Sequence, residues 1–345
     1  MPMPKLTPAE ADAISRFERG AERPQTEAWY MKVSLGGGRA LQLRIGFTQR
    51  TIGKREARAE VWAAVSRGLA EGAEHVALRS HHPMSDVRVE QEILYVRVGE
   101  VELTHGHCRG ELQDPEGPGR IRWNLEFTRQ PEGFRHLTSP WMYRSSWIPS
   151  KACSPQVDAR FKGKVEVDQE LLQVDDAPGL LAHHWGSDLA DGWVWAHCND
   201  WHDKEGIVLE GAHARSRFGP LPLPAMTTLH VRIPGERITI NGLMELIRTE
   251  SRVKGLSWRI CGVHGDRRVE ASFQASSDRF VGVDQVAPDG RVIHVVSSAL
   301  ADGSITVSGK HARGWTPIVS VVADQSAFLQ FGTRGDTHGV PIVLR

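Results

Sequence analysis

The residues best suited to chemistry lie in one stretch, residues 183–201, which reads HHWGSDLADGWVWAHCNDW. Near its end an imidazole, a carboxamide and a carboxylate follow one another closely. Imidazole and carboxylate groups can move a proton, and an amide can orient a hydroxyl or a water molecule. These residue types predict acid–base chemistry, with three catalytic candidates: His197, Asn199 and Asp200.

A strand must position these groups, because bulky and small residues alternate with period two through residues 193–199. One face of this strand carries Trp193, Trp195, His197, Asn199 and Trp201, and the other carries Val194, Ala196, Cys198 and Asp200. The aromatic face is typical of a pocket for an apolar molecule with one polar end, and the small face is typical of a packed core. A tryptophan-rich core with satisfied polar groups is the alternative interpretation of the same residues.

The motif His184-Trp185-Gly186, followed by Trp193-x-Trp195-x-x-Cys198-Asn199, resembles a known family signature. It is similar to the signature of the tocopherol cyclase and hydroxyneurosporene synthase (carotenoid 1,2-hydratase) superfamily. That resemblance implies two lipocalin-like β-barrel halves, and long isoprenoid substrates in several members. Two positions differ from the pattern, because His184 replaces the usual Asn and His197 replaces the usual Gln.

Further segments extend the resemblance over most of the chain. Glu27-Ala28-Trp29-Tyr30 resembles the opening element of bacterial members, and Pro149-Ser150-Lys151 resembles the piece that precedes the second half. We therefore expect an N-terminal domain over residues 1–165 and a C-terminal domain over residues 166–345. The expected substrate-binding residues are His184, Trp185, Trp193, Trp195, Trp201 and Trp29.

The rest of the chain predicts an all-β fold of two lipocalin-like antiparallel barrel or sandwich halves, because many short alternating runs are separated by turn residues. The capping box Thr7-Pro8-Ala9-Glu10 predicts one short helix over residues 8–19. Residues 55–69 pose a conflict, since their composition favours a helix while the family resemblance favours a strand. We predict a strand over residues 60–66.

Composition narrows the possible partners of this chain of 345 residues. Its 42 basic residues balance 42 acidic ones, so bulk charge does not predict a nucleic-acid partner. We find no apolar run of about 18 residues, which leaves at most peripheral membrane contact. Four widely spaced cysteines predict free thiols and a cytoplasmic protein. The oligomeric state stays open.

A metal site is the weaker alternative. The histidines between residues 183 and 213, with Asp200 or Asp203, offer nitrogen and oxygen ligands, but no His-x-His pair shares a strand face there. We predict no metal and no cofactor.

The leading hypothesis is an enzyme that adds water to, or cyclises across, a C=C bond of an isoprenoid or polycyclic molecule by acid assistance. A non-catalytic lipophile carrier and a pericyclase are the alternatives.

Overall fold

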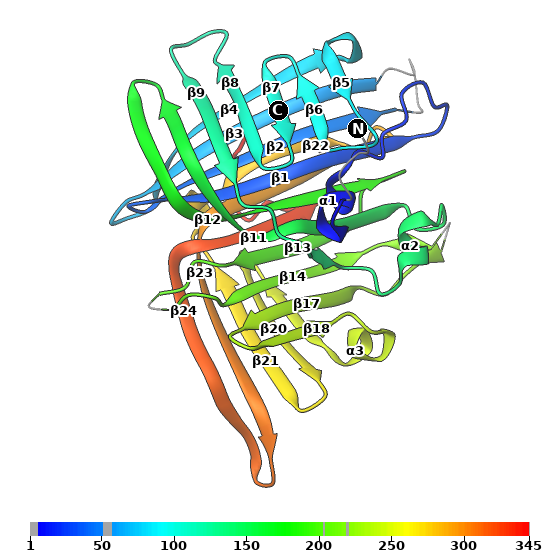
Figure 1. Cartoon of the computed structure of the whole chain (residues 1–345), viewed down its shortest axis with the longest axis vertical. Helices are drawn as coiled ribbons and strands as arrows, with labels where there is room; N and C mark the ends of the chain where they lie inside the picture. The colour runs from blue at the N-terminus through cyan, green and yellow to red at the C-terminus, as the bar shows by residue number, and fades with distance from the viewer. Residues whose placement is uncertain (1–5, 51–56, 203, 219–220, 345) are drawn as a thin grey trace.

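The computed structural model describes residues 6–50, 57–202, 204–218 and 221–344. Most of the described residues lie in strands, and these strands form two large, almost wholly antiparallel sheets. In Figure 1 the first sheet lies in the upper part of the molecule, and most of the second sheet lies below it. The predicted all-β fold of two antiparallel halves with a short N-terminal helix is confirmed.

The first sheet contains 12 strands among the described residues. They are β1 (Gln25–Gly36), β2 (Arg39–Gln49), β3 (Ala57–Gly68), β4 (Ala73–Pro83), β5 (Val87–Val89), β6 (Tyr95–Val98), β7 (Val101–Thr104), β8 (His107–Gln113), β9 (Arg120–Phe127), β10 (Phe134–Arg135), β11 (Ser150–Val167) and β12 (Glu170–Gly186). β3 confirms the strand predicted over residues 60–66, whereas residues 55 and 56 lie outside the described part. Buried and outward-facing residues alternate cleanly along β9, which is the pattern of a half-buried strand.

The second sheet holds the predicted signature strand, β13 (Gly192–Cys198). Its other strands are β14 (Val208–Arg215), β17 (Met226–Ile233), β18 (Glu236–Ile240), β19 (Glu250–Lys254), β20 (Ser257–His264), β21 (Arg267–Gln274), β22 (Val281–Val286), β23 (Val292–His311), β24 (Gly314–Thr333) and β25 (Ile342–Leu344). A small separate hairpin joins β15 (Arg217–Phe218) to β16 (Leu221–Pro222). The long hairpin of β23 and β24 projects downward from the body in Figure 1.

The first helix, α1 (Pro8–Ala13), is shorter than predicted. The capping box is present, because the Glu10 amide donates to Thr7 Oγ1 and the Thr7 amide donates to Glu10 Oε2. The helix ends early because the Ser15 hydroxyl and the Arg16 amide donate to the buried Glu27 carboxylate instead of continuing the helix. The other short helical elements are α2 (Pro140–Arg144), α3 (Leu243–Arg248), and the 3₁₀ turns at Met84–Asp86 and Ser277–Arg279.

Each half has its own apolar core. Trp123 and Phe161 belong to the core of the first half, and Trp258 and Phe273 to that of the second. A smaller cluster joins the two sheets, and its members include Leu180 of β12, Trp195 of β13 and Phe328 of β24. We call this junction between the sheets the seam.

The chain passes from the first sheet to the second through residues 187–191, between β12 and β13. Residue 165 lies inside β11, which pairs with β12 over much of its length. We therefore propose that the boundary between the two domains lies at residues 187–191 and not at residue 165. In the part of the chain that the structure describes, no helix is both long and apolar enough to cross a membrane. The cytoplasmic location stays a prediction.

Candidate active site

A cavity of about 130 Å³ lies at the seam, and both halves contribute to its wall. We call it the seam cavity. Aromatic and small apolar side chains form most of the wall, and a few polar groups interrupt them. From the first half come Tyr30, His136, Ser150, Ala152, Cys153, Ser154, Ala182, His183 and His184. From the connecting loop and the second half come Leu189, Ala190, Trp193, Val194, Trp195, Glu210, Ala212, Ala214 and Gln330.

The polar centre of this wall is Glu210 in the middle of β14, whose side chain is completely buried. Its Oε1 accepts hydrogen bonds from Ser154 Oγ at 2.6 Å and from Trp195 Nε1 at 3.0 Å, and it lies 3.2 Å from His136 Nε2. Its Oε2 is also buried and has no hydrogen-bond partner among the described residues. A buried carboxylate oxygen without a partner is costly, so this atom needs a functional explanation.

The electrostatic setting keeps Glu210 ionised. Burial raises the pKa of this carboxyl group, but hydrogen bonds from His136 and Ser154 and the charge interaction with His136 outweigh burial and lower the pKa below its usual range. His136 is oriented in turn, since its Nδ1 lies 2.9 Å from Thr228 Oγ1. The arrangement therefore presents a buried carboxylate in the cavity wall, with Oε1 held by three neighbours and Oε2 without a hydrogen-bond partner among the described residues.

Sequence reasoning missed both Glu210 and His136. Glu210 is the single charged residue in the otherwise apolar run of residues 207–212, and a lone charge in a buried strand is the signal that could have identified it. No local signal identifies His136, which comes from the segment after β10 and meets Glu210 only through the packing of the two halves.

Tryptophan and tyrosine side chains form the aromatic part of the wall. Trp195 packs edge-on against Tyr30, with ring centroids 6.0 Å apart, and Trp193 Nε1 donates to Gln330 Oε1 at 2.9 Å. The Tyr30 hydroxyl accepts from Arg44 Nε at 3.0 Å and from Gln285 Nε2 at 3.2 Å. These contacts fix the orientation of the rings before any ligand enters.

Of the residues predicted to bind substrate, Trp193, Trp195 and His184 line the seam cavity. His184 Nε2 lies 3.0 Å from Ser150 Oγ, and burial lowers the pKa of His184 to about 3. This imidazole is therefore neutral near neutral pH. On the opposite face of β13, Val194, Ala196 and Cys198 are buried in the core of the second half, and Val194 also lines the seam cavity.

His197 and Asn199 do not line the seam cavity. His197 Nε2 donates to the Val157 carbonyl at 2.7 Å, and Asn199 Nδ2 donates to Asp158 Oδ1 and to the Gly179 carbonyl, both at 3.0 Å. The first half packs directly against this end of β13, so both side chains join the halves instead of facing open space. Burial lowers the pKa of His197 to about 4.

The other predicted site residues lie away from the seam cavity. β13 ends at Cys198, so the alternation stops there and Trp201 enters the core of the second half. Asp200 follows that strand end and is outside the cavity wall. Trp29 is buried in the first half, where its ring stacks on His183 with centroids 4.8 Å apart. Trp185 stacks on His183 at 4.7 Å and lines a different cavity.

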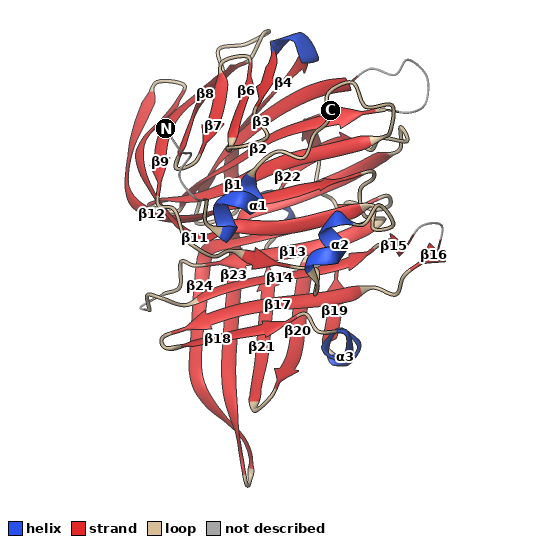
Figure 2. Cartoon of the chain, turned by 45° about the vertical axis from the view of Figure 1, so that its right-hand side comes forward, coloured by secondary structure: helices blue, strands red, loops and turns tan. Residues whose placement is uncertain are grey.

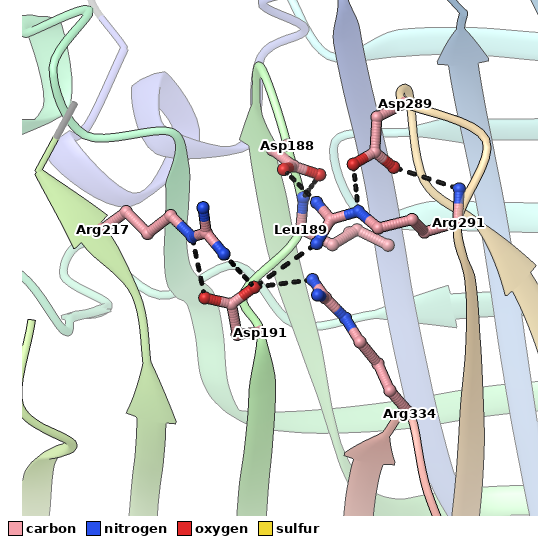
Figure 3. Close-up of polar contacts among 7 residues, drawn as sticks. All are labelled: Asp188, Leu189, Asp191, Arg217, Asp289, Arg291 and Arg334. Atoms are coloured by element: carbon pink, nitrogen blue, oxygen red, sulfur yellow. Dashed lines mark hydrogen bonds and ion pairs between the residues drawn. The ribbon is translucent and has the colours of Figure 1, made fainter. Parts of the chain in front are cut away.

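The loop of residues 187–191 closes one side of the seam cavity through Leu189 and Ala190. Figure 3 shows the ion pairs that anchor it. Asp188 pairs with Arg291 at 2.7 Å, and Asp191 pairs with Arg334 at 2.6 Å and with Arg217 at 2.9 Å. Both ends of the loop are thus tied to the second half.

Within the described ranges, no group of three or more His, Cys, Asp or Glu residues has a geometry that could hold a metal ion. The histidines proposed as ligands have separate partners: His183 bonds Glu27, His184 bonds Ser150, and His213 bonds Thr227. Asp203 lies outside the described residues.

Comparison with known proteins establishes only the fold. No family model matches the chain. The curated relatives are two uncharacterized Mycobacterium tuberculosis proteins, Rv0493c of strain H37Rv and MT0513 of strain CDC 1551, each 28% identical over 155 residues, or 44% of this chain. The matched region spans 46%, about half, of each relative's length.

Solved structures match over nearly the whole chain. An AttH candidate from Nitrosomonas europaea has a TM-score of 0.54 at 12% identity, covering 93% of this chain and 97% of its own. CghA has a TM-score of 0.51 at 9% identity, covering 98% of this chain and 95% of its own. At such low identity the likeness shows a shared architecture of the two halves and carries no information on activity.

Proposed function

We propose that this protein is an enzyme that acts on a hydrophobic small molecule in the seam cavity, and that Glu210 transfers the proton. The observation that carries this proposal is the unpartnered Oε2 of Glu210 in an apolar, aromatic wall. A passive binding site gains nothing from a buried carboxylate oxygen that has no hydrogen-bond partner. In a proton-transfer site, such an oxygen is free to accept the proton.

The reaction that fits is addition of an O–H group across a C=C bond. Oxygen of water, or of a hydroxyl in the substrate itself, bonds to one carbon as the π bond breaks. The O–H proton passes to Glu210 Oε2 and is then delivered to the neighbouring carbon, so atoms and charge balance. With water the outcome is hydration, and with an internal hydroxyl the outcome is cyclisation.

The protein's other groups assist at fixed positions. His136, Ser154 and Trp195 hold Oε1, which leaves Oε2 without a hydrogen-bond partner and able to take up the proton. The aromatic rings of Trp193 and Trp195 hold the apolar carbon skeleton of the substrate beside this carboxylate. We assign His197 and Asn199 a positioning role at the seam in place of the catalytic role expected from sequence.

The size of the seam cavity limits what enters. About 130 Å³ is close to the ~150 Å³ of a cavity that accepts benzene, so the space fits one ring or one prenyl unit. We propose that the reacting end of a larger isoprenoid or polycyclic molecule occupies it. The motif resemblance to the tocopherol cyclase superfamily supports this substrate class, and membership of that superfamily is part of the proposal.

The test compares the wild type with Glu210→Gln, which preserves shape and removes the titrating group. Each protein is incubated in D₂O with a panel of prenyl alcohols and prenylated phenols, and products are analysed by mass spectrometry. Wild type should form product with one new C–D bond, and Glu210→Gln should lower the rate by a factor of roughly 10²–10⁴. Glu10→Gln is the matched control, because Glu10 is also buried but does not line the seam cavity.

The same experiment separates the enzyme from a lipophile carrier. If the wild type binds panel members, as measured by quenching of tryptophan fluorescence, but forms no deuterated product, the carrier is supported. Turnover that persists in Glu210→Gln would remove Glu210 from the mechanism.

A further inference from the structure

A second cavity, of about 440 Å³, lies outside the proposed active site. Its wall is formed by the segment after α1, the start of β1, the end of α2, and the ends of β11 and β12. Figure 2 shows where these elements lie in the fold. Lys151 pairs with Trp185 across these two strands, and both line this cavity, whereas the adjacent Ser150 and His184 line the seam cavity. Because side chains alternate along a strand, the two cavities lie on opposite faces of the β11–β12 pair.

The ammonium group of Lys151 carries the argument. Lys151 is only 8% exposed, and among the described residues it has no hydrogen bond and no ion pair. Burial, and then the charge of Arg23, lower its pKa, which shows that the surroundings disfavour an uncompensated charge. Buried lysines without a partner are rare because of this cost.

The remaining charges around the second cavity do not compensate Lys151. The wall holds four cationic side chains, those of Arg16, Arg23, Arg144 and Lys151, against the carboxylates of Glu18 and Glu27. Glu18 already pairs with Arg23, and Glu27 accepts from His183, Ser15 and the Arg16 amide. The unsatisfied charge of the cavity is therefore positive.

Hydroxyl groups accompany these cations. Ser146 and Ser187 line the same wall, and neither side chain has a hydrogen-bond partner among the residues described. Ammonium, guanidinium and hydroxyl donors that converge on one space suit an anion with several acceptor oxygens.

We propose that the second cavity binds a phosphate-bearing small molecule. Lys151 provides the central charged contact, Arg144 adds a second at the rim, and Ser146 and Ser187 donate to the remaining oxygens. The volume exceeds what inorganic phosphate fills, so an organic portion of the ligand extends along Tyr143 and Trp185.

Isothermal titration with inorganic pyrophosphate at low salt tests this proposal. Wild type should bind it, and Lys151→Met should weaken binding by about tenfold to hundredfold, since a charge-assisted hydrogen bond is lost. Lys164→Met is the matched control, because it makes the same change at an exposed position of the same strand. Arg144→Gln, at an exposed site where folding is not at risk, should weaken binding as well.

The outcomes are decisive in each direction. The proposal would be overturned if the wild type did not bind pyrophosphate, or if Lys151→Met and Arg144→Gln both bound it as tightly as the wild type. Equal losses of affinity in Lys151→Met and Lys164→Met would also overturn it. Co-sedimentation with phosphatidylcholine vesicles that contain phosphatidic acid separates the two sources of phosphate. Binding to pyrophosphate without co-sedimentation supports a soluble ligand, and Lys151-dependent co-sedimentation supports a lipid headgroup in the same cavity.

Discussion

Three histidines near the seam carry no charge at neutral pH. Burial is the main cause in each case, and it lowers the pKa of His184 to about 3 and those of His197 and His230 to about 4. In the unfolded chain the same groups have a pKa of about 6.5. The unfolded chain thus binds more protons than the folded protein below this value, so stability is complete above pH 6.5 and falls as the pH drops toward 4.

His197→Gln should reduce this acid sensitivity. The amide can donate to the Val157 carbonyl as the imidazole does, but it cannot take up a proton. Between pH 7.5 and pH 5 the variant should lose about 2 kcal/mol less unfolding free energy than the wild type, measured by urea denaturation. His311→Gln, which removes an imidazole from the surface, is the control. If His197→Gln and the wild type lost the same unfolding free energy between the two pH values, the lowered pKa of His197 would not be a cause of the acid sensitivity.

Residue roles were the hardest feature to predict from sequence. Glu210 lies 56 positions from Ser154 and 74 from His136, so no local pattern connects the groups that form its site. His197 shares a strand face with Trp195, as predicted, yet the first half covers it. A strand's own alternation gives the direction of a side chain and does not show what packs on that face.

Elements were predicted well where period two is strong. β13 lies where the alternation of residues 193–199 predicted a strand, and β3 covers the strand predicted over residues 60–66. The ends of elements were predicted less well, because contacts with distant residues determine them. The hydrogen bond from the Arg16 amide to Glu27 ends α1 early, and β13 stops before Trp201.

The two faces of β13 should respond differently to substitution. Ala196 is fully buried and pairs with Gly211, where an added Cβ would lie 2.8 Å from Leu229 Cδ2. Ala196→Leu should overpack this core and cost about 1–3 kcal/mol of unfolding free energy in urea denaturation. Its ligand affinity should persist below the unfolding transition.

Trp195→Ala is the comparison on the opposite face, because it removes part of the cavity wall and the hydrogen bond to Glu210. Trp195→Ala should bind the panel of prenyl alcohols and prenylated phenols more weakly, and it should also be less stable. If Ala196→Leu abolishes binding in the folded state while Trp195→Ala leaves it intact, the assignment of faces is wrong.

At the scale of the whole molecule, access to the seam cavity depends on the loop of residues 187–191. Three arginines from separate parts of the second half converge on its two aspartates (Figure 3). Leu189 and Ala190 between those aspartates face the cavity, so release of the loop would open that wall.

Asp191→Asn should loosen the loop by removing the charge that Arg217 and Arg334 share. We expect the association rate of the neutral dye Nile red, measured by stopped flow, to rise about fivefold, the equivalent of about 1 kcal/mol. Added salt should accelerate the wild type and have little effect on the variant. Asp266→Asn removes a pair on an outer hairpin and is the control. Equal rates in both variants would show that the loop does not limit entry.

The division of the cavity wall between two sheets has a consequence for how the proposed activity would be gained and lost. Ser154 belongs to one sheet and Glu210 to the other, so neither half contains a site of its own. A chain whose halves are each folded but not docked would retain its β-sheet spectrum and its two apolar cores, yet it would be inert. The rate of the proposed reaction would then depend on how many molecules have docked halves, and not on how many have folded halves. During synthesis it would begin only when β14 reaches a first half that is already in place.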